Sequence, residues 1–205
     1  MRRQIAQLRP MTRSRRAPAV ACAFISLVLA VSGVPARIWA QAPPDEYQVK
    51  AAFLFHFAQL VEWPPAAFAG NAQPLYLCLL DDDPSQRDFE STIDGKSVGD
   101  RALRVRLLHQ PQDVQGCNVL FLSRDESRRE RSLLTSVRGQ PVLTVGETDD
   151  FLKAGGMIRF HLDNGRIRFD INLASADSVR LRISSQLLLL ATQVFRSSVE
   201  DRGGM

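Results

Sequence analysis

The sequence predicts a single α/β domain, a three-layer Rossmann- or flavodoxin-like fold whose mainly parallel sheet carries helices on both faces and ends in a β-hairpin. Three observations lead to this prediction. Apolar segments typical of buried strands alternate three times with helical segments. A hairpin signature centred on Asn164-Gly165 follows them. The 165 residues after position 40 suit one domain with a full core.

Residues 1–40 are typical of a secretory signal and are not expected to join the fold. They contain seven Arg and no acidic residue, an apolar segment at 19–31, and a small residue, Ala40, at a cleavage site. The alternative, a retained membrane anchor, needs a longer apolar segment. The rest of the chain has 19 basic residues, the chain's 26 less these seven, against 22 acidic ones. We therefore expect an exported protein that does not bind nucleic acid.

The domain is expected over residues 41–200, with a disordered tail at 201–205, and it opens with a helix over 45–63. Asp45 and Gln48 form a capping pattern, and Pro64 prevents the helix from continuing. One broad side of this helix is apolar at helical spacing, through Val49, Phe53, Leu54, Phe57, Ala58, Leu60 and Val61.

Phe55 falls on the polar side of this helix, with His56, Gln59 and Glu62. Two interpretations stay open. Phe55 lies under a neighbouring loop, or it belongs to a second contact surface for a partner or for another copy of the chain. These four residues form the candidate interaction surface.

Four segments predict the strands of the parallel part of the sheet, namely 74–80, 102–108, 118–122 and 141–145. The second alternates Leu and Val with Arg, so we expect it half-exposed and near an edge. Helices are expected between and after the strands, at 84–93, 126–137 and 149–153. A flavodoxin-like order would make the first and third strands neighbours.

A hairpin and two further elements complete the predicted domain. A type I′ turn at Asn164-Gly165 would place Arg159 opposite Asp170 and gather the apolar side chains on the other face. A last strand is expected at 178–183 and a terminal helix at 186–199, with residues 187–191 in the core. The apolar cross-strand pairs of the hairpin would be Leu162 with Ile167, Phe160 with Phe169, and Ile158 with Ile171.

The cysteines of the domain predict a disulfide. Only Cys78 and Cys117 remain once the leader, with Cys22, is set aside, and export places them in an oxidising compartment. Cys78 lies in the first strand and Cys117 just ahead of the third, so their bridging agrees with the predicted strand order. Two free buried thiols are the alternative. No metal site or cofactor is predicted, because the three histidines lack ligand spacing with the cysteines.

Acidic residues follow two predicted strands. Asp81, Asp82 and Asp83 end the first strand and Asp125 follows the third, an arrangement similar to the phosphate-accepting receivers of response regulators. The alternative is that these carboxylates cap the next helices. Asp81, Asp82 and Ser123 form a candidate crevice for a small ligand at the carboxyl ends of the strands. No catalytic residue is predicted, because no nucleophile stands at a recognisable spacing from a base.

Three segments in order resemble the signatures of one family. The first is Tyr-x-x-Lys-Ala-Ala-Phe-Leu-x-x-Phe-Ala-x-x-Val-x-Trp-Pro at 47–64, the second spans 151–160 and 168–172, and the third spans 183–191. Together they resemble the YfiR family, exported proteins that restrain inner-membrane diguanylate cyclases. The spacing of Cys78 and Cys117 also resembles the structural disulfide of that family.

The resemblance implies a periplasmic, usually dimeric α/β domain that is not an enzyme. It would bind the periplasmic sensor segment of a membrane-bound diguanylate cyclase and hold the cyclase inactive until an outer-membrane lipoprotein or a redox change releases it. This sequence lacks the second cysteine pair of some members, so switching through that pair cannot apply. His56 and Asp170 stand where the family often has Asn and Glu. The alternative function is a periplasmic small-ligand carrier or sensor.

Overall fold

The sheet is the element around which every other part of the fold packs. The computed structural model describes residues 46–70, 73–80 and 86–196, which fall in one compact unit. The predicted leader, the predicted tail at 201–205, and Asp81, Asp82 and Asp83 lie outside the described residues. Within the described residues no helix is both long and apolar enough to cross a bilayer.

Eight strands form one sheet in the order β10-β8-β7-β6-β5-β2-β4-β3. Neighbouring strands are parallel except at the β7–β8 hairpin and the β3–β4 pair, so the predicted fold class is confirmed. In chain order the strands are β2 (Leu75–Leu80), β3 (Ser97–Val98), β4 (Arg101–Leu108), β5 (Val119–Leu122), β6 (Leu143–Gly146), β7 (Ile158–Asp163), β8 (Arg166–Asn172) and β10 (Gln193–Phe195).

The parallel strands lie where the hydrophobic pattern predicts them. β2, β5 and β6 come from near-continuous apolar segments and are almost entirely buried, because both faces of the sheet are covered. β4, whose sequence alternates with Arg, is partly exposed and lies second from the edge. β2 pairs with both β4 and β5, so the first and third predicted strands are neighbours, as in flavodoxin-like folds.

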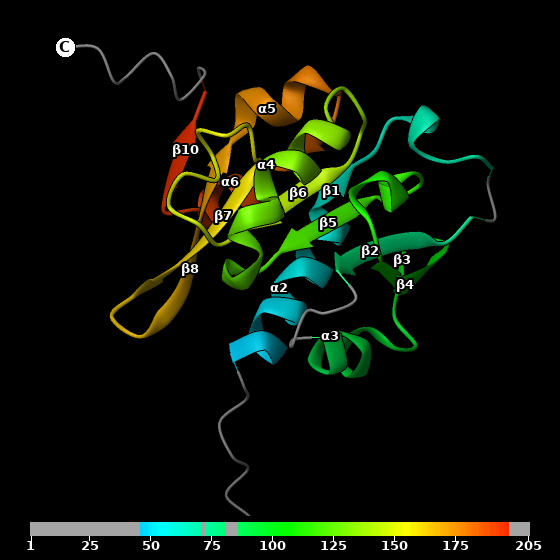
Figure 1. Cartoon of the computed structure of the whole chain (residues 1–205), viewed down its shortest axis with the longest axis horizontal. Helices are drawn as coiled ribbons and strands as arrows, with labels where there is room; N and C mark the ends of the chain where they lie inside the picture. The colour runs from blue at the N-terminus through cyan, green and yellow to red at the C-terminus, as the bar shows by residue number, and fades with distance from the viewer. Residues whose placement is uncertain (1–45, 71–72, 81–85, 197–205) are drawn as a thin grey trace, which may run out of the picture. The chain divides into compact units, whose positions relative to one another are not determined.

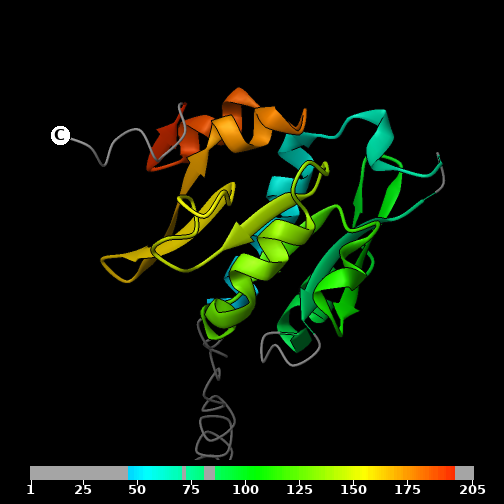
Figure 2. The same ribbon diagram turned by 45° about the horizontal axis from the view of Figure 1, so that its top comes forward.

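Helices cover both faces of the sheet (Figures 1 and 2). On one face lie α2 (Glu46–Leu60), α3 (Gln86–Ile93) and α6 (Ser185–Leu190), which share one core cluster with the strands. On the other face lies α4 (Ser127–Ser136), which packs on a second cluster. The remaining helical elements are η1 (Pro65–Ala67), η2 (Pro111–Val114), η3 (Arg124–Glu126) and α5 (Leu173–Ser178).

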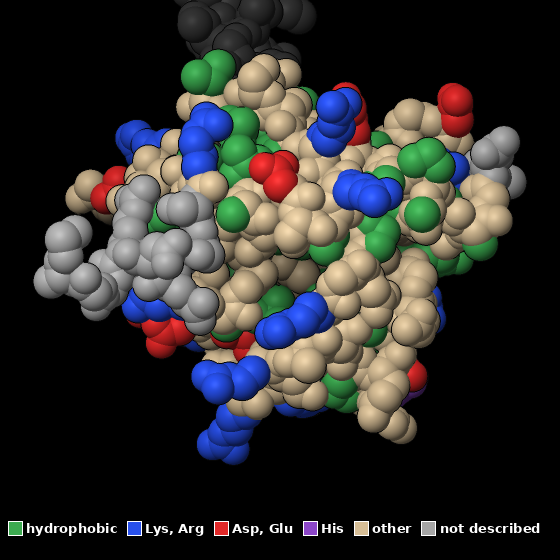
Figure 3. Space-filling view, turned by 90° about the horizontal axis from the view of Figure 1, so that it is seen from above, with side chains coloured by type: hydrophobic (Ala, Val, Ile, Leu, Met, Phe, Trp, Pro, Cys, Tyr) green, Lys and Arg blue, Asp and Glu red, His purple; other side chains and the backbone are tan. Residues whose placement is uncertain are grey.

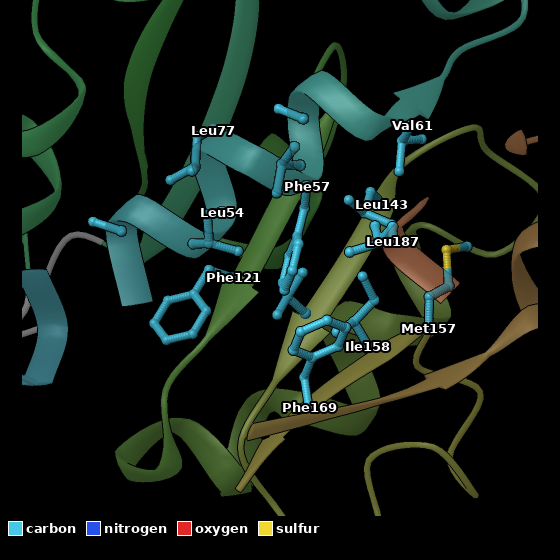
Figure 4. Close-up of a cluster of buried hydrophobic side chains, with 14 of the residues drawn as sticks. Leu54, Phe57, Val61, Leu77, Phe121, Leu143, Met157, Ile158, Phe169 and Leu187 are labelled. Atoms are coloured by element: carbon cyan, nitrogen blue, oxygen red, sulfur yellow. The ribbon is translucent and has the colours of Figure 1, made fainter. Parts of the chain in front are cut away.

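The larger core cluster is built on α2. Leu54, Phe57 and Ala58 are almost fully buried and belong to a cluster shared with side chains of the sheet (Figure 4). Phe57 stacks on Phe160 at 5.6 Å and meets the edge of Phe169 at 4.9 Å between ring centroids. A buried side chain of this size contributes roughly 1.5–3 kcal/mol to folding, so α2 anchors this face of the sheet.

The second cluster contains the disulfide. Cys78 and Cys117 are bonded, with their Cα atoms 6.0 Å apart, and both side chains are buried. Because Cys78 lies on β2 and Cys117 just before β5, the bond joins neighbouring strands of the sheet. The sequence predicts this pair.

The hairpin has the predicted register. Ile158 pairs with Ile171, Arg159 with Asp170, Phe160 with Phe169 and Leu162 with Ile167. Asn164 and Gly165 have φ values of 50° and 72°, the left-handed conformation that a type I′ turn requires. The turn residues and the alternating side chains therefore agree on one register.

The first helix is shorter than the sequence predicts. It ends at Leu60, and β1 (Val61–Glu62) follows, paired with β9 (Arg182–Ile183). The carbonyl of Leu60 accepts a hydrogen bond from Ser184 N at 2.9 Å. Tertiary pairing with a segment far along the chain therefore ends the helix before Pro64 does.

The region after the hairpin differs most from prediction. The expected strand at 178–183 is wrong except at its last two residues. Asn172 caps α5 by accepting from Ser175 N at 3.1 Å, and the helix therefore extends to Ser178. The expected helix at 186–199 is also wrong over 191–196, because the chain leaves the helix after Leu190 and forms β10 beside β8. Residues 197–199 lie outside the described residues.

The terminal leucines are not all core residues. Leu187 is buried, whereas Leu189 and Leu190 are 86% and 60% exposed. Consecutive residues of a helix point about 100° apart, so four adjacent leucines cannot share one buried side. The expectation that residues 187–191 form core is therefore wrong for two of them.

The helix expected at 149–153 is a series of turns. Phe151 is fully buried between Gly146 and Gly156, and a Cβ added to either glycine would lie within 2.3 Å of its ring. The segment folds back over this ring, which a regular helix would not permit.

Candidate functional site

The predicted interaction surface lies on the outer side of α2. His56 and Gln59 are exposed, and His56 Nδ1 and Gln59 Oε1 are 3.2 Å apart. Phe55 is half-buried, contacts the larger core cluster, and has Lys96 Nζ 5.1 Å from its ring centroid. Phe55 is thus only partly available for a partner, whereas His56 and Gln59 are exposed and contact each other.

Glu62 does not lie on this helix. It is on β1, where it lines an open hollow of about 510 Å³ with Trp63, Pro64, Pro65, Asp177, Arg180, Leu181 and Arg182. Trp63 Nε1 donates to the carbonyl of Asn118 at 3.3 Å, which fixes the indole at the side of this hollow. The structure therefore places Glu62 on a strand, whereas the other three residues of the predicted surface lie on α2.

A buried ion cluster occupies the carboxyl edge of the parallel sheet, the edge at which β5 and β6 end. Lys50 Nζ lies 2.5 Å from Glu46 Oε1 and 2.6 Å from Glu147 Oε1. Lys50 and Glu147 are each 5% exposed. Arg124 N donates to Glu147 Oε2 at 3.2 Å, so each buried charge has a partner. The cluster joins α2 to the residues that follow both strands.

This cluster is not among the predicted sites, although the sequence contains a signal for it. Lys50 stands four residues before Leu54 and seven before Phe57, so it shares their buried side of the helix. A buried lysine needs a carboxylate partner. Glu46 provides one at i−4 and is visible in the sequence, whereas Glu147 is about a hundred residues away and only the fold brings it close.

Ser123, the one described residue of the predicted ligand crevice, follows β5 at the same edge. Ser123 is fully buried, and among the described residues its Oγ has no hydrogen-bond partner. Asp81 and Asp82 are outside the described residues, so the crevice as predicted stays a proposal. Beside the ion cluster is a small hollow of about 70 Å³, lined by Glu46, Lys50, Arg124, Glu147, Phe160, His161, Leu162 and Ile167. Its two acidic and two basic groups already neutralise one another.

A second buried carboxylate lies on the hairpin. Asp170 is 2% exposed, and its Oδ2 lies 2.7 Å from Arg159 Nη2 and 3.5 Å from His161 Nδ1. Arg159 Nη1 also donates to the carbonyl of Asp149 at 3.2 Å. The cross-strand pair that the register predicts therefore also holds the turns at 149–153 against the hairpin.

Glu130 has a perturbed protonation equilibrium. Burial raises the pKa of this carboxyl above its ordinary value, and the charge of Asp150 acts in the same direction, whereas a hydrogen bond from Thr148 and the charge of Arg131 oppose the rise. Thr148 Oγ1 donates to Glu130 Oε2 at 2.6 Å. The described residues contain no group of three His, Cys, Asp or Glu side chains arranged to hold a metal.

Two solved structures resemble this fold. One is a conserved domain protein from Vibrio cholerae O1 biovar El Tor, with a TM-score of 0.50, 9% identity, and coverage of 73% of this chain and 60% of that one. The other is the ABC domain in complex with L-Trp from Streptococcus pneumonia, with a TM-score of 0.47, 9% identity, and coverage of 69% and 61%. The chain thus spans about three fifths of the length of each, and the first likeness shows the α/β fold alone.

The sequence also matches a known family. The match covers residues 47–192, from the first turn of α2 to the residue before β10, and so includes every strand of the sheet but β10. All three segments that resemble the family signatures fall within it. The chain belongs to the YfiR/HmsC-like family.

Proposed function

We propose that the protein is an exported regulator that represses an inner-membrane diguanylate cyclase by binding the cyclase's periplasmic sensor segment. The observation that carries this proposal is the family match over residues 47–192, because membership of this family suggests a periplasmic regulator of diguanylate cyclases. Residues 1–40 would be the secretory signal that directs export, and no catalytic step is proposed. An outer-membrane lipoprotein is proposed as the partner that relieves repression.

Repression would work by population shift. A protein that binds the inactive conformation of the sensor more tightly than the active conformation lowers the population of the active conformation. Moving such an equilibrium from 1:99 to 99:1 requires a difference in affinity of about 10⁴-fold. The exposed outer side of α2, with His56 and Gln59, supports a contact of this kind, since neither side chain is needed by the core. We also propose that the protein forms a homodimer, for which the exposed Leu189 and Leu190 are candidate contacts beside the α2 surface.

The test is genetic. Deleting the gene should raise cyclic-di-GMP and biofilm formation. Adding back the wild-type gene should return both to their original lower levels. The Gln59→Arg gene should lower both quantities less than the wild-type gene does, because the longer, charged side chain would disturb the proposed contact surface. Ser132→Arg is the matched control, since Ser132 is exposed on α4, which covers the other face of the sheet. Unchanged cyclic-di-GMP after deletion contradicts the proposal.

Phe55→Asp tests whether the half-buried ring belongs to the same surface. The variant should weaken binding to the sensor segment while the unfolding midpoint stays near that of the wild type. A large fall in the midpoint would instead assign Phe55 to the core, where its contacts with the larger cluster already place part of the ring.

A further inference from the structure

A hollow of about 200 Å³ lies at the amino edge of the parallel sheet, opposite the edge that carries the ion cluster. It is formed by the end of α4, the start of β6, the turn before β7, and α5. Figure 3 shows the face of the molecule that carries α5, over which Lys and Arg side chains are spread. The hollow is lined by Leu134, Val137, Arg138, Gly139, Thr144, Ala154, Gly155, Met157, Ser175, Ser178 and Val179.

The charge of this hollow is not balanced. Among the described residues, Arg138 is its one charged lining residue. The hollow beside the ion cluster has two acids and two bases, and the one that contains Glu62 likewise has two of each. The hollow between α3 and β4 has two acids and one base. Of these four hollows, the one beside Arg138 therefore has a net positive lining and favours an anion.

The guanidinium of Arg138 is available for a ligand. The side chain is exposed and forms no ion pair or side-chain hydrogen bond in the part of the chain that the structure describes. Three of the last four carbonyls of α4, which would favour a cation, already accept hydrogen bonds, namely those of Leu133, Thr135 and Ser136. Val137 N donates to Leu133 O, Gln140 N donates to Val137 O at 3.0 Å, and Gln140 Nε2 donates to Ser136 O at 2.8 Å.

Hydroxyl groups add donors and acceptors. Thr144 is 2% exposed, and its Oγ1 accepts from Met157 N at 3.0 Å, so the hydroxyl hydrogen is left for another acceptor. Ser178 Oγ donates to the carbonyl of Ser175 at 2.7 Å and keeps its lone pairs. A carboxylate beside Arg138 would thus meet a charged donor, with a hydroxyl donor deeper in the hollow.

The remaining wall is aliphatic. Leu134, Val137 and Met157 are each at most 8% exposed, and Val179 is half-buried beside them. No aromatic ring from the described part of the chain lines the hollow. Its volume is below the roughly 300–1,000 Å³ of pockets for drug-sized ligands. The lining therefore suits a short aliphatic chain with a single negative charge at one end.

We propose that this hollow is a binding site for a short aliphatic carboxylate, with Arg138 holding the carboxylate and Leu134, Val137, Met157 and Val179 enclosing the chain. The proposal does not depend on repression of a cyclase, because it concerns binding to the isolated protein. It gives the protein a site through which a small molecule could act on α4 and α5 together.

Titration calorimetry with hexanoate tests the site, using protein purified from cells that express the full chain. The wild type should bind hexanoate and should bind 1-hexanol, which has the same chain length and no charge, at least tenfold more weakly. Arg138→Gln should weaken hexanoate binding at least tenfold and leave 1-hexanol unaffected. Arg128→Gln, which removes an exposed arginine of α4 outside the hollow, should bind hexanoate within twofold of the wild type.

Ser178→Phe tests, independently of charge, whether the aliphatic chain of the ligand binds in this hollow. Ser178 is exposed at the end of α5, and a phenyl ring there would fill the hollow, so binding of both compounds should be lost. The site is overturned if the wild type does not bind millimolar hexanoate, or if Arg138→Gln binds it as the wild type does. Equal binding of 1-hexanol and hexanoate by the wild type also overturns it.

Discussion

The two edges of the parallel sheet differ in whether their charged side chains are paired. At the carboxyl edge, Lys50, Glu46 and Glu147 form a compact cluster, and the two most buried members are each 5% exposed. At the amino edge, Arg138 stands exposed beside an aliphatic hollow and has no ion-pair partner among the described residues. Both edges contain a hollow, but the smaller one is electrically balanced and the larger one is not.

The difference separates a structural role from a binding role. Buried ions are costly unless paired, so the cluster at the carboxyl edge is bound to its own partners and offers little to a ligand. An exposed guanidinium costs nothing in folding when unpaired, so it can be kept for an anion. The crevice at the carboxyl ends of strands is the usual ligand site of open α/β sheets, yet in the described residues the exposed and unpaired charge of Arg138 lies at the other edge.

Breaking the ion cluster at the carboxyl edge should have the largest effect on stability of the changes considered. Lys50→Met removes the cation and leaves Glu147 buried, so the free energy of unfolding should fall by roughly 3–5 kcal/mol. Denaturant titration measures this fall. Lys153→Met is the matched control, because the Lys153–Asp150 pair is exposed at both ends and such pairs contribute at most about 1 kcal/mol. Equal effects of the two changes would show that the cluster is not structural.

Removing the disulfide, which lies nearer to the amino edge, should have the second largest effect on stability. The double change Cys78→Ala and Cys117→Ala removes a bond that spans 39 residues of sequence, which should lower the free energy of unfolding by roughly 2–4 kcal/mol. Thermal and denaturant unfolding, compared with those of Lys50→Met, would rank the two. If the double variant unfolds like the wild type, the bond between β2 and the start of β5 does not add to the stability that the sheet already provides.

The smallest expected effect is a change in the pH dependence of stability. Burial raises the pKa of Glu130 above its ordinary value of 4.5, so the folded state binds this proton more tightly than the unfolded state. Stability from Glu130 is therefore fully present at low pH and is lost as the pH rises from 4.5 through the raised pKa. Glu130→Gln, which can still accept from Thr148, should flatten the fall of unfolding free energy with rising pH.

A matched change keeps this pH prediction specific. Glu62→Gln removes an exposed carboxylate and should leave the pH profile of the wild type unchanged. A steeper loss of stability with rising pH in Glu130→Gln than in the wild type would contradict the assignment of the raised pKa to Glu130.

Much of the fold could be predicted from local patterns. Four parallel strands (β2, β4, β5 and β6), the register of the hairpin and the disulfide follow from apolar segments, turn residues and cysteine number, whereas β10 lies where a helix was expected. The hairpin is the clearest case, because an Asn-Gly turn and period-two alternation specify the same pairing. The three segments that resemble the family signatures are likewise local patterns of the chain.

The candidate sites were harder to predict. His56 and Gln59 are exposed as the helical spacing requires, whereas Glu62 is displaced because β1 pairs with β9. Lys50 was overlooked although its position among Leu54 and Phe57 indicated burial. Arg138 carries no motif at all, since a single arginine after a helix has no meaning until the residues around it are known.

The sequence by itself determined the strands β2, β4, β5 and β6 and the hairpin, that α2 has a buried side, and which two cysteines can pair, because these depend on periodicity and composition within short stretches. Only the tertiary structure decided where α2 ends, that Leu189 and Leu190 are exposed, and that Glu147 meets Lys50 across about a hundred residues. These outcomes depend on contacts between distant segments, and the free energy of such contacts overrides the weak local preferences of the chain.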